Sequence, residues 1–373
     1  MIKAKILYIA RGGLVSGSQR QLLNLLARLD RNQFEPFVVC SEGGEFADKV
    51  ADLEIETRIY PSFFGWRKMR YFFRRYQLCS SLLRQLSGRD IQLIHCSYQW
   101  YAPYCFYLSR HLKCPNLVHV RCPVKQSTVR HYRFNYADHL IAISPHIHKN
   151  LINAGVCPDK VSLVYDSIDT DVFRPLPPSC RRLNQNGQFV FGLVGRIEPG
   201  KYQLAFLHAA RILASRHNNV KFVLVGQVNH DEYAQKVKQL MKDFDLCDRV
   251  IMYGRCEQMP NLLSEIDVLV SLSGGSVMYE AMACGVPVLS AGFTHPMNAA
   301  HVIHDHNAVR LDSRSPEDVA SAMETMLENT EYTRKLAANT RPHILSHLND
   351  RAMATQTQSI YERLLCPEFL NRK

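Results

Sequence analysis

Two cations in the second half of the chain have the spacing of a site for a phosphorylated ligand. Arg196 and Lys201 lie five residues apart on a loop with Gly and Pro, and this loop follows the apolar run 189–195. Arg offers a planar pair of donors to phosphate oxygens, whereas Lys offers a compact positive charge. Together they could neutralise a departing diphosphate, whose negative charge grows in the transition state. A solvated surface turn is the alternative for this loop taken alone.

A second junction has the pattern of an anion site at the start of a helix. A β-branched run predicts a buried strand, which Gly274 and Gly275 follow, and a short helix is expected over 277–284. Ser276 has the N-cap position, and free backbone N–H groups there could bind an anion. Glu280 could then hold a neighbouring hydroxyl. An ordinary turn between strand and helix, with a solvated Glu280, is the alternative.

The elements that must position these residues alternate along the chain. Strand candidates are the runs 4–10, 36–40, 92–96, 116–120, 139–143, 161–165, 189–195, 221–226, 250–254 and 267–272, and a further strand is expected to start at Pro287. Helical periodicity appears between several of them. Repeats of strand, helix and strand build parallel sheets, which bind ligands at the carboxyl ends of their strands. The sequence therefore predicts an α/β fold of two tandem, doubly wound domains.

A proline-rich, polar stretch divides the 373 residues, which are too many for one typical core. We predict an N-terminal domain over 1–175, a linker over 176–188 and a C-terminal domain over 189–348. A closing helix and tail would occupy 349–373.

The chain carries a formal net charge of +11, which favours acidic or phosphorylated partners. The positive charge is concentrated in the basic, aromatic stretch Arg67–Arg75, within a helical pattern from about Trp66 to Leu86. A solvated basic face is one interpretation of this stretch. A surface helix that contacts an anionic membrane is the other.

Twelve cysteines have irregular spacing without a Cys-x-x-Cys pair, which argues against a zinc site. Several lie in apolar runs, where a reduced thiol acts as a small hydrophobe. We see no signal-peptide pattern at the first residues and no run of ~20 apolar residues. We therefore expect a reduced, cytoplasmic protein, with peripheral contact at the inner face of the membrane as an open alternative.

The chain resembles the GT-B glycosyltransferases, and within them the large retaining group called glycosyltransferase family 4. The residues that carry the resemblance are Gly195-Arg196, Lys201, Gly226, Gly254 and the run Glu280–Val288, with looser similarity over 137–144 and 166–169. The resemblance implies two Rossmann-like domains with a nucleotide-sugar in the cleft between them. It also implies that the last helix packs back on the first domain.

The resemblance also implies roles for single residues. Arg196 and Lys201 would neutralise the donor diphosphate, and Glu280 would bind the ribose hydroxyls. The other donor-binding residues would be Gly195, Gly226, Arg255, Cys256, Gly274, Gly275, Ser276 and Val277. On the acceptor side the resemblance implies Gly17, Ser18, His119 and Arg121. Neither a cofactor nor a metal is expected, because the two cations take the metal's place.

Three positions depart from the family pattern. Leu272 stands eight residues before Glu280, where the family usually has an acidic residue that touches the donor sugar. Arg121 stands where a functional His is common, although His119, a candidate base or hydrogen-bond donor, lies two residues away. Asp166-Ser167 replaces the usual Asn-Gly before the hinge. The identity of the donor sugar is therefore left open.

We expect a glycosyltransferase that moves a sugar from a UDP- or GDP-type donor to a hydroxyl group with retention of configuration. The acceptor would be a saccharide, a lipid-linked molecule or a phosphorylated molecule in polysaccharide, lipopolysaccharide or glycolipid assembly. A non-catalytic GT-B protein that binds a nucleotide-sugar or scaffolds a complex, and an epimerase of the same fold, are the alternatives. Nucleic-acid binding would rest only on net charge, and no recognisable motif supports it.

Overall fold

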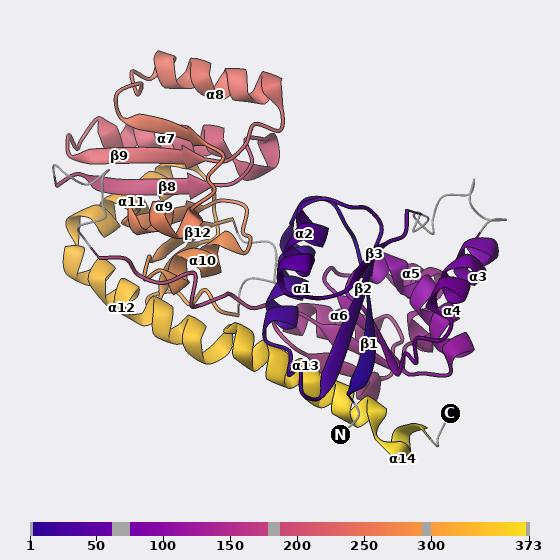
Figure 1. The fold of residues 1–373 in the computed structure, drawn as a ribbon. Coiled ribbons are helices and arrows are strands. Elements are labelled where there is room, and N and C mark those ends of the chain that lie inside the picture. The colour runs from indigo at the N-terminus through magenta and orange to yellow at the C-terminus, as the bar shows by residue number, and fades with distance from the viewer. Residues whose placement is uncertain (1–2, 62–74, 178–186, 293–299, 371–373) are drawn as a thin grey trace. The chain divides into compact units, whose positions relative to one another are not determined.

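The computed structural model describes residues 3–61, 75–177, 187–292 and 300–370. These residues form two compact units, of which the first comprises Met1–Ser167 with Asp350–Lys373 and the second Ile168–Asn349. Each unit is built on one parallel sheet with helices packed against it (Figure 1). The predicted α/β fold of two doubly wound, Rossmann-like units is therefore confirmed.

The sheet of the first unit has seven strands in the order β3-β2-β1-β4-β5-β6-β7, all parallel. The strands are β1 (Ala4–Ala10), β2 (Phe34–Cys40), β3 (Thr57–Ile59), β4 (Leu93–Cys96), β5 (Asn116–Val120), β6 (His139–Ala142) and β7 (Val161–Leu163). The helices are α1 (Gly17–Ala27), α2 (Glu45–Asp52), α3 (Arg75–Leu86), α4 (Ala102–Leu112), α5 (Gln126–Tyr132), α6 (Pro145–Asn153), α13 (Asp350–Leu365) and α14 (Pro367–Leu370).

The sheet of the second unit has six parallel strands in the order β10-β9-β8-β11-β12-β13. The strands are β8 (Phe189–Val194), β9 (Val220–Val225), β10 (Val250–Gly254), β11 (Val268–Ser271), β12 (Val288–Ala291) and β13 (Ala308–Leu311). The helices are α7 (Gln203–Ala214), α8 (Asp231–Asp243), α9 (Met259–Ser264), α10 (Val277–Ala283), α11 (Pro316–Glu328) and α12 (Thr330–His347).

The C-terminal helix α13 belongs to the core of the first unit. Tyr361 is fully buried and its ring meets the ring of Phe34 edge to face, with centroids 5.6 Å apart. At the start of the helix, Nε of Arg28, the residue directly after α1, donates a hydrogen bond of 2.6 Å to Asp350 Oδ2. The Asp350 side chain is almost completely buried, so this charged pair fixes where the helix begins. The prediction that the last helix packs on the first domain is confirmed.

The boundary between the compact units falls after Ser167, eight residues before the predicted end of the first domain. Hydrogen bonds to residues of the second unit explain why the boundary lies before the predicted one. Ile168 donates its N–H to the Leu348 carbonyl at 2.8 Å, and Arg341 donates to the Phe173 carbonyl at 2.7 Å. The stretch that begins at Ile168 is therefore bound to the second unit.

Two short strands, β3 and β13, were not among the predicted ones. β3 has only three residues and β13 four, and each contains an Arg, so neither gives a clear apolar run. The helix expected from about Trp66 to Leu86 is present as α3 from Arg75 onward. The other residues for which this helix was predicted, nearly all of the basic stretch and most of the predicted linker lie outside the described residues.

Three buried histidines lie on the neighbouring strands β4, β5 and β6 of the first unit: His95, His119 and His139. Burial lowers the pKa of His95 to about 3 and that of His139 to about 4, helped by the positive charges of Arg121 and Arg363 respectively. The pKa of His119 is also held well below its ordinary value, chiefly by burial. All three rings are therefore neutral near pH 7.

We expect the first unit to lose stability as the pH falls below about 6.5, the ordinary pKa of histidine. The unfolded chain binds protons at these rings in that range, whereas the folded unit resists protonation down to about pH 4 or below. The contribution of these histidines to the free energy of unfolding is therefore fully present above pH 6.5. As the pH falls below that value, each ring lowers the free energy of unfolding by up to about 1.4 kcal/mol per pH unit. Urea unfolding at several pH values between 7.5 and 4.5 measures this loss.

His139→Gln removes one of these rings and keeps a polar group near Ser162, so its stability should fall less steeply with pH. His111→Gln, which changes an exposed histidine of the same unit, is the matched control and should follow the wild-type slope. Equal slopes for all three proteins would contradict the explanation.

Candidate active site

The loops after β8 and β11 carry most of the predicted site residues. β8 has β9 on one side and β11 on the other, so the strand order reverses at this point. Ligands of such sheets bind in the crevice outside the carboxyl ends of the strands at the reversal. Arg196 follows β8 and Ser273 follows β11, and Lys201 Nζ donates a hydrogen bond of 3.2 Å to Ser273 Oγ. The structure thus brings the cation loop and the glycine loop together.

The two cations differ in their surroundings. Lys201 is half buried, and burial lowers its pKa while the negative charge of Glu198 opposes that shift. Arg196 is more exposed, and its Nη2 lies 2.9 Å from Glu198 Oε1. The other Glu198 oxygen accepts a hydrogen bond of 2.8 Å from Asn229. Glu198 therefore competes with a diphosphate for the charge of Arg196.

Glu280 lies on α10 with only 6% of its surface exposed. This burial contradicts the alternative of a solvated carboxylate. A buried carboxylate is costly unless polar groups surround it, which sets Glu280 apart from an ordinary helix surface residue. Its predicted contact with a ribose remains a prediction.

Ser276 is the N-cap residue of α10, as predicted, but its side chain accepts no hydrogen bond from the helix. Its φ of −64° and ψ of −24° are already helical, whereas a capping side chain needs an extended backbone. The turn before it depends on Gly274 and Gly275, whose φ values are 70° and 127°. Val277 begins the helix, so these four predicted donor residues do form one strand-to-helix turn.

Gly195 and Gly226 allow the ends of β8 and β9 to approach closely. A Cβ on Gly226 would stand 2.0 Å from the Gly195 carbonyl oxygen, so no larger residue fits. Arg255 and Cys256 follow the edge strand β10 at the same end of the sheet. Burial raises the pKa of the Cys256 thiol, which therefore stays protonated at neutral pH.

Leu272 and Arg314 form a feature that sequence reasoning missed. Leu272 is 1% exposed and packs in the core, so its side chain points away from any ligand. Arg314 Nε donates a hydrogen bond of 2.7 Å to the Leu272 carbonyl, and Nη2 donates to the Gly292 carbonyl. The guanidinium also lies 4.4 Å from the centre of the Tyr202 ring. Arg314 thus ties the ends of β11 and β12 together beside the cation loop.

The predicted acceptor residues lie at two places in the first unit. Gly17 and Ser18 are the first residues of α1, and Ser16 is the N-cap residue of that helix. His119 lies near the carboxyl end of β5, and Arg121 follows that strand. Arg121 forms an ion pair with Asp166, so its charge is partly neutralised.

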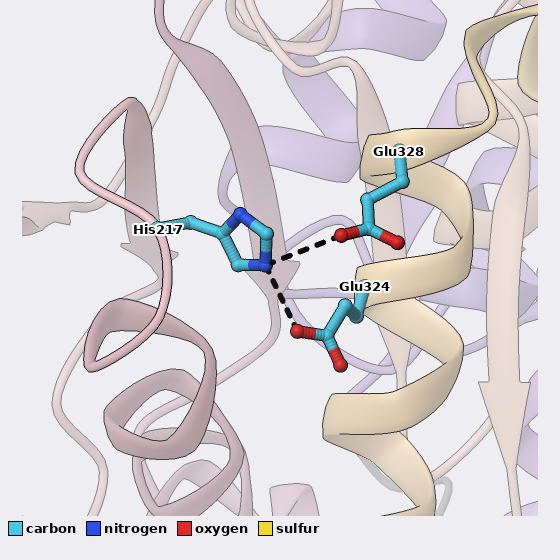
Figure 2. A group of neighbouring side chains, drawn as sticks. All are labelled: His217, Glu324 and Glu328. Atoms are coloured by element: carbon cyan, nitrogen blue, oxygen red, sulfur yellow. Dashed lines mark hydrogen bonds and ion pairs between the residues drawn. The ribbon is translucent and has the colours of Figure 1, made fainter.

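In the described part of the chain, His217, Glu324 and Glu328 place three potential metal ligands together (Figure 2). His217 Nε2 lies 2.9 Å from Glu324 Oε1 and 3.8 Å from Glu328 Oε1. Arg216 Nη1, however, already donates a hydrogen bond of 2.8 Å to the second oxygen of Glu324. An ion-pair cluster between the end of α7 and α11 therefore accounts for this geometry without a cation.

Two parallel, doubly wound units, a last helix that completes the first one and cations at a strand-order reversal define the GT-B class of fold. Solved structures share it. The structure of Anabaena HepE in complex with UDP matches with a TM-score of 0.83 at 20% identity, and the match covers 96% of this chain and 100% of that one. A glycosyltransferase from Rickettsia africae ESF-5 matches with a TM-score of 0.85 at 15% identity, covering 98% and 99%.

Two family models match the sequence. Glycosyltransferase Family 4 matches residues 15–172, and Glycosyl transferases group 1 matches residues 181–343. The chain belongs to glycosyltransferase family 4.

Curated relatives match over part of their length. A D-inositol 3-phosphate glycosyltransferase of Frankia alni is 27% identical over 197 residues, which are 48% of this chain and 48% of the relative. An Escherichia coli UDP-Gal:alpha-D-GlcNAc-diphosphoundecaprenol alpha-1,3-galactosyltransferase is 32% identical over 149 residues, which are 36% and 37%. The chain thus spans about half the length of the curated relatives it matches, or less.

We expect Arg314→Ala to lower the free energy of unfolding by about 1–3 kcal/mol, because two buried carbonyl oxygens lose their hydrogen bonds. It should also weaken nucleotide binding, since the turn after β11 loses its support. Urea unfolding and a thermal-shift titration with UDP measure the two effects. Arg334→Ala, at an exposed position of α12, is the matched control and should change neither. Unchanged UDP binding in Arg314→Ala would exclude this support.

Proposed function

We propose that this chain transfers a sugar from a nucleoside-diphosphate sugar to a hydroxyl acceptor with retention of anomeric configuration. Assembly of a surface polysaccharide or glycolipid is the proposed setting. The observation that carries the proposal is the hydrogen bond from Lys201 to Ser273, because it joins the cation loop to the glycine loop at the strand-order reversal. Family membership supports the same reaction class.

In the proposed reaction the bond between the sugar's anomeric carbon and the diphosphate oxygen breaks while the acceptor hydroxyl attacks from the same face. The acceptor proton passes to the departing phosphate oxygen. Arg196 and Lys201 stabilise the negative charge that grows on the diphosphate, which is the electrostatic role that a divalent metal has elsewhere. We therefore propose that transfer needs no added metal.

The relatives suggest where to begin with substrates. Anabaena HepE has been solved with UDP and with UDP-glucose, so a UDP-sugar is the first donor to test. The names of two relatives specify a phosphorylated inositol and a diphosphate-linked lipid as acceptors. A phosphorylated or lipid-linked acceptor is therefore part of the proposal.

One observation favours a second candidate function, nucleotide-sugar binding without transfer. Leu272 lies where the family usually has an acid, and its side chain is buried in the core. A contact to the donor sugar is then missing at this position, whereas the diphosphate cations are present. A protein of this second kind would bind the donor and turn nothing over.

We expect UDP-, GDP-, ADP- or TDP-sugars to raise the melting temperature, and the matching donor to be turned over with unchanged rate in EDTA. NMR of the product should show the anomeric configuration of the donor. No stabilisation by any nucleotide would refute donor binding, and binding without turnover would establish the second candidate function.

Substitutions at Arg196 and Lys201 test whether these residues form the site of the reaction. Arg196→Ala and Lys201→Ala should each lower kcat by about a hundredfold, the usual cost of losing one group that stabilises transition-state charge. Glu198→Gln is the matched control in the same loop. It should tighten UDP binding by up to about fivefold, since an exposed ion pair is weak but competes for Arg196. Full activity in both alanine variants would exclude the assigned site.

We further propose that the basic stretch Arg67–Arg75 contacts anionic membranes. No helix in the described ranges is long and apolar enough to cross a bilayer, so the contact would be peripheral. Replacing the Arg and Lys residues of this stretch with Ser should reduce sedimentation with phosphatidylserine vesicles by tenfold or more, because each cation near the surface adds to the attraction. Ser at Lys236, Lys238 and Lys242 of α8, all exposed, is the control. Equal losses in both variants would show a general charge effect.

A further inference from the structure

Four buried side chains of the first unit are joined in a row by hydrogen bonds, and we call this row of side chains the hydrogen-bonded chain. The hydroxyls of Tyr8 and Tyr361 lie 3.2 Å apart, and the Tyr361 hydroxyl lies 2.6 Å from His95 Nδ1. His95 Nε2 in turn lies 3.0 Å from His119 Nδ1. The chain therefore runs from α13 and β1 across β4 to the carboxyl end of β5, and no member is more than 4% exposed.

The protonation states of these groups restrict the directions of the hydrogen bonds. Burial lowers the pKa of both histidines and raises the pKa of both tyrosines, so the rings are neutral and the hydroxyls keep their hydrogens. A neutral imidazole has one N–H donor and one acceptor nitrogen. His95 must therefore accept from Tyr361 and donate to His119, or donate to Tyr361 and accept from His119.

Each arrangement leaves one donor without a protein acceptor, and the two arrangements differ in where that donor lies. When Tyr361 donates to His95, Tyr8 donates to Tyr361, and every hydroxyl hydrogen has an acceptor. When His95 donates to Tyr361, one of the two hydroxyl hydrogens has none, because the described residues offer these hydroxyls only each other and His95. In the first arrangement the unpaired donor is instead Nε2–H of His119, which is 4% exposed, whereas Tyr8 and Tyr361 are 0% exposed. A donor without a partner costs most where it is fully buried, which favours the first arrangement.

We propose that Tyr361 and His95 are positioning residues that hold the His119 hydrogen on Nε2, so that His119 donates a hydrogen bond to an oxygen of the bound substrate. His95 donates to Nδ1 of His119, which leaves Nε2 as the protonated nitrogen. In the described part of the chain no protein group bonds to that nitrogen, and it is not among the fully buried polar atoms that lack a partner. His119 is then a donor and not a general base.

The surroundings of His119 suit an oxygen ligand. Arg121, two residues further on, brings a positive charge to the same end of β5, and its repulsion adds to burial, the larger cause, in lowering the pKa of His119. A neutral N–H group beside a guanidinium attracts the partial negative charge of a hydroxyl or phosphate oxygen. The substrate assignment rests on the proposed function, whereas the tautomer of His119 does not.

The experiment is nitrogen-15 NMR of the histidine side chains in the full chain without ligand, with the His119 signal assigned from a His119→Gln variant. We expect a protonated Nε2 and an unprotonated Nδ1 in the wild type. Tyr361→Phe removes the donor to His95, so a clear population of the Nδ1–H form of His119 should appear. Tyr8→Phe is the matched control, because it removes a buried hydroxyl of the same chain but leaves Tyr361 able to donate.

Two results would overturn the positioning role. One is a wild-type His119 with its hydrogen on Nδ1. The other is a Tyr361→Phe variant with the wild-type tautomer of His119. The wild-type spectrum decides the first point even if Tyr361→Phe does not fold, and neither result depends on whether the protein transfers a sugar.

Ligand titrations separate the substrate contact from the tautomer. A shift of the His119 Nε2–H signal with UDP-glucose would identify a donor oxygen, and a shift with glycerol 3-phosphate an acceptor-type oxygen. No shift with either ligand, where calorimetry shows that each binds, would exclude the contact. Failure of both ligands to bind would count against the proposed function and leave the tautomer result intact.

Discussion

The chemistry of the second unit depends on one constraint, the reversal of strand order at β8. Because all the strands are parallel, every following loop leaves the sheet at the same edge, and only at the reversal do neighbouring loops diverge. Lys201 and Ser273 meet across that divergence although they are 72 residues apart in sequence. The glycines of the site serve the same constraint, since Gly226 has room only for a hydrogen where β8 and β9 converge. The site of the two cations therefore depends on the order of the strands as much as on the residue types.

Much of the fold follows from the sequence because a strand buried on both faces is a continuous apolar run. The runs at β1, β5 and β10 predict their strands to the residue, and parallel order follows from the alternation with helices. Short strands that carry an Arg do not have this pattern, so β3 and β13 could not be found in this way.

The site was predicted less completely than the fold. Arg196 and Lys201 could be found because they share a short loop, which sequence spacing reveals. Arg314 could not, because its partners Leu272 and Gly292 lie on other strands and its own neighbours look like an ordinary polar turn. Ser276 is a different case. Its residue type suits a capping side chain, but its backbone is already helical, so the side chain does not cap the helix. Side-chain type predicts a role only where the local backbone is also known.

The assignment of α13 to the first unit has a consequence for biosynthesis. That unit combines residues 1–167 with a segment that the ribosome adds only after the whole of the second unit. Domains usually fold in order as they emerge during translation. Here the second unit is complete first, while the earlier-made sheet waits with the surface that α13 will cover still open to solvent. The nascent chain therefore carries an exposed apolar face while the second unit is made, and the first unit can close only after residues 350–365 have left the ribosome.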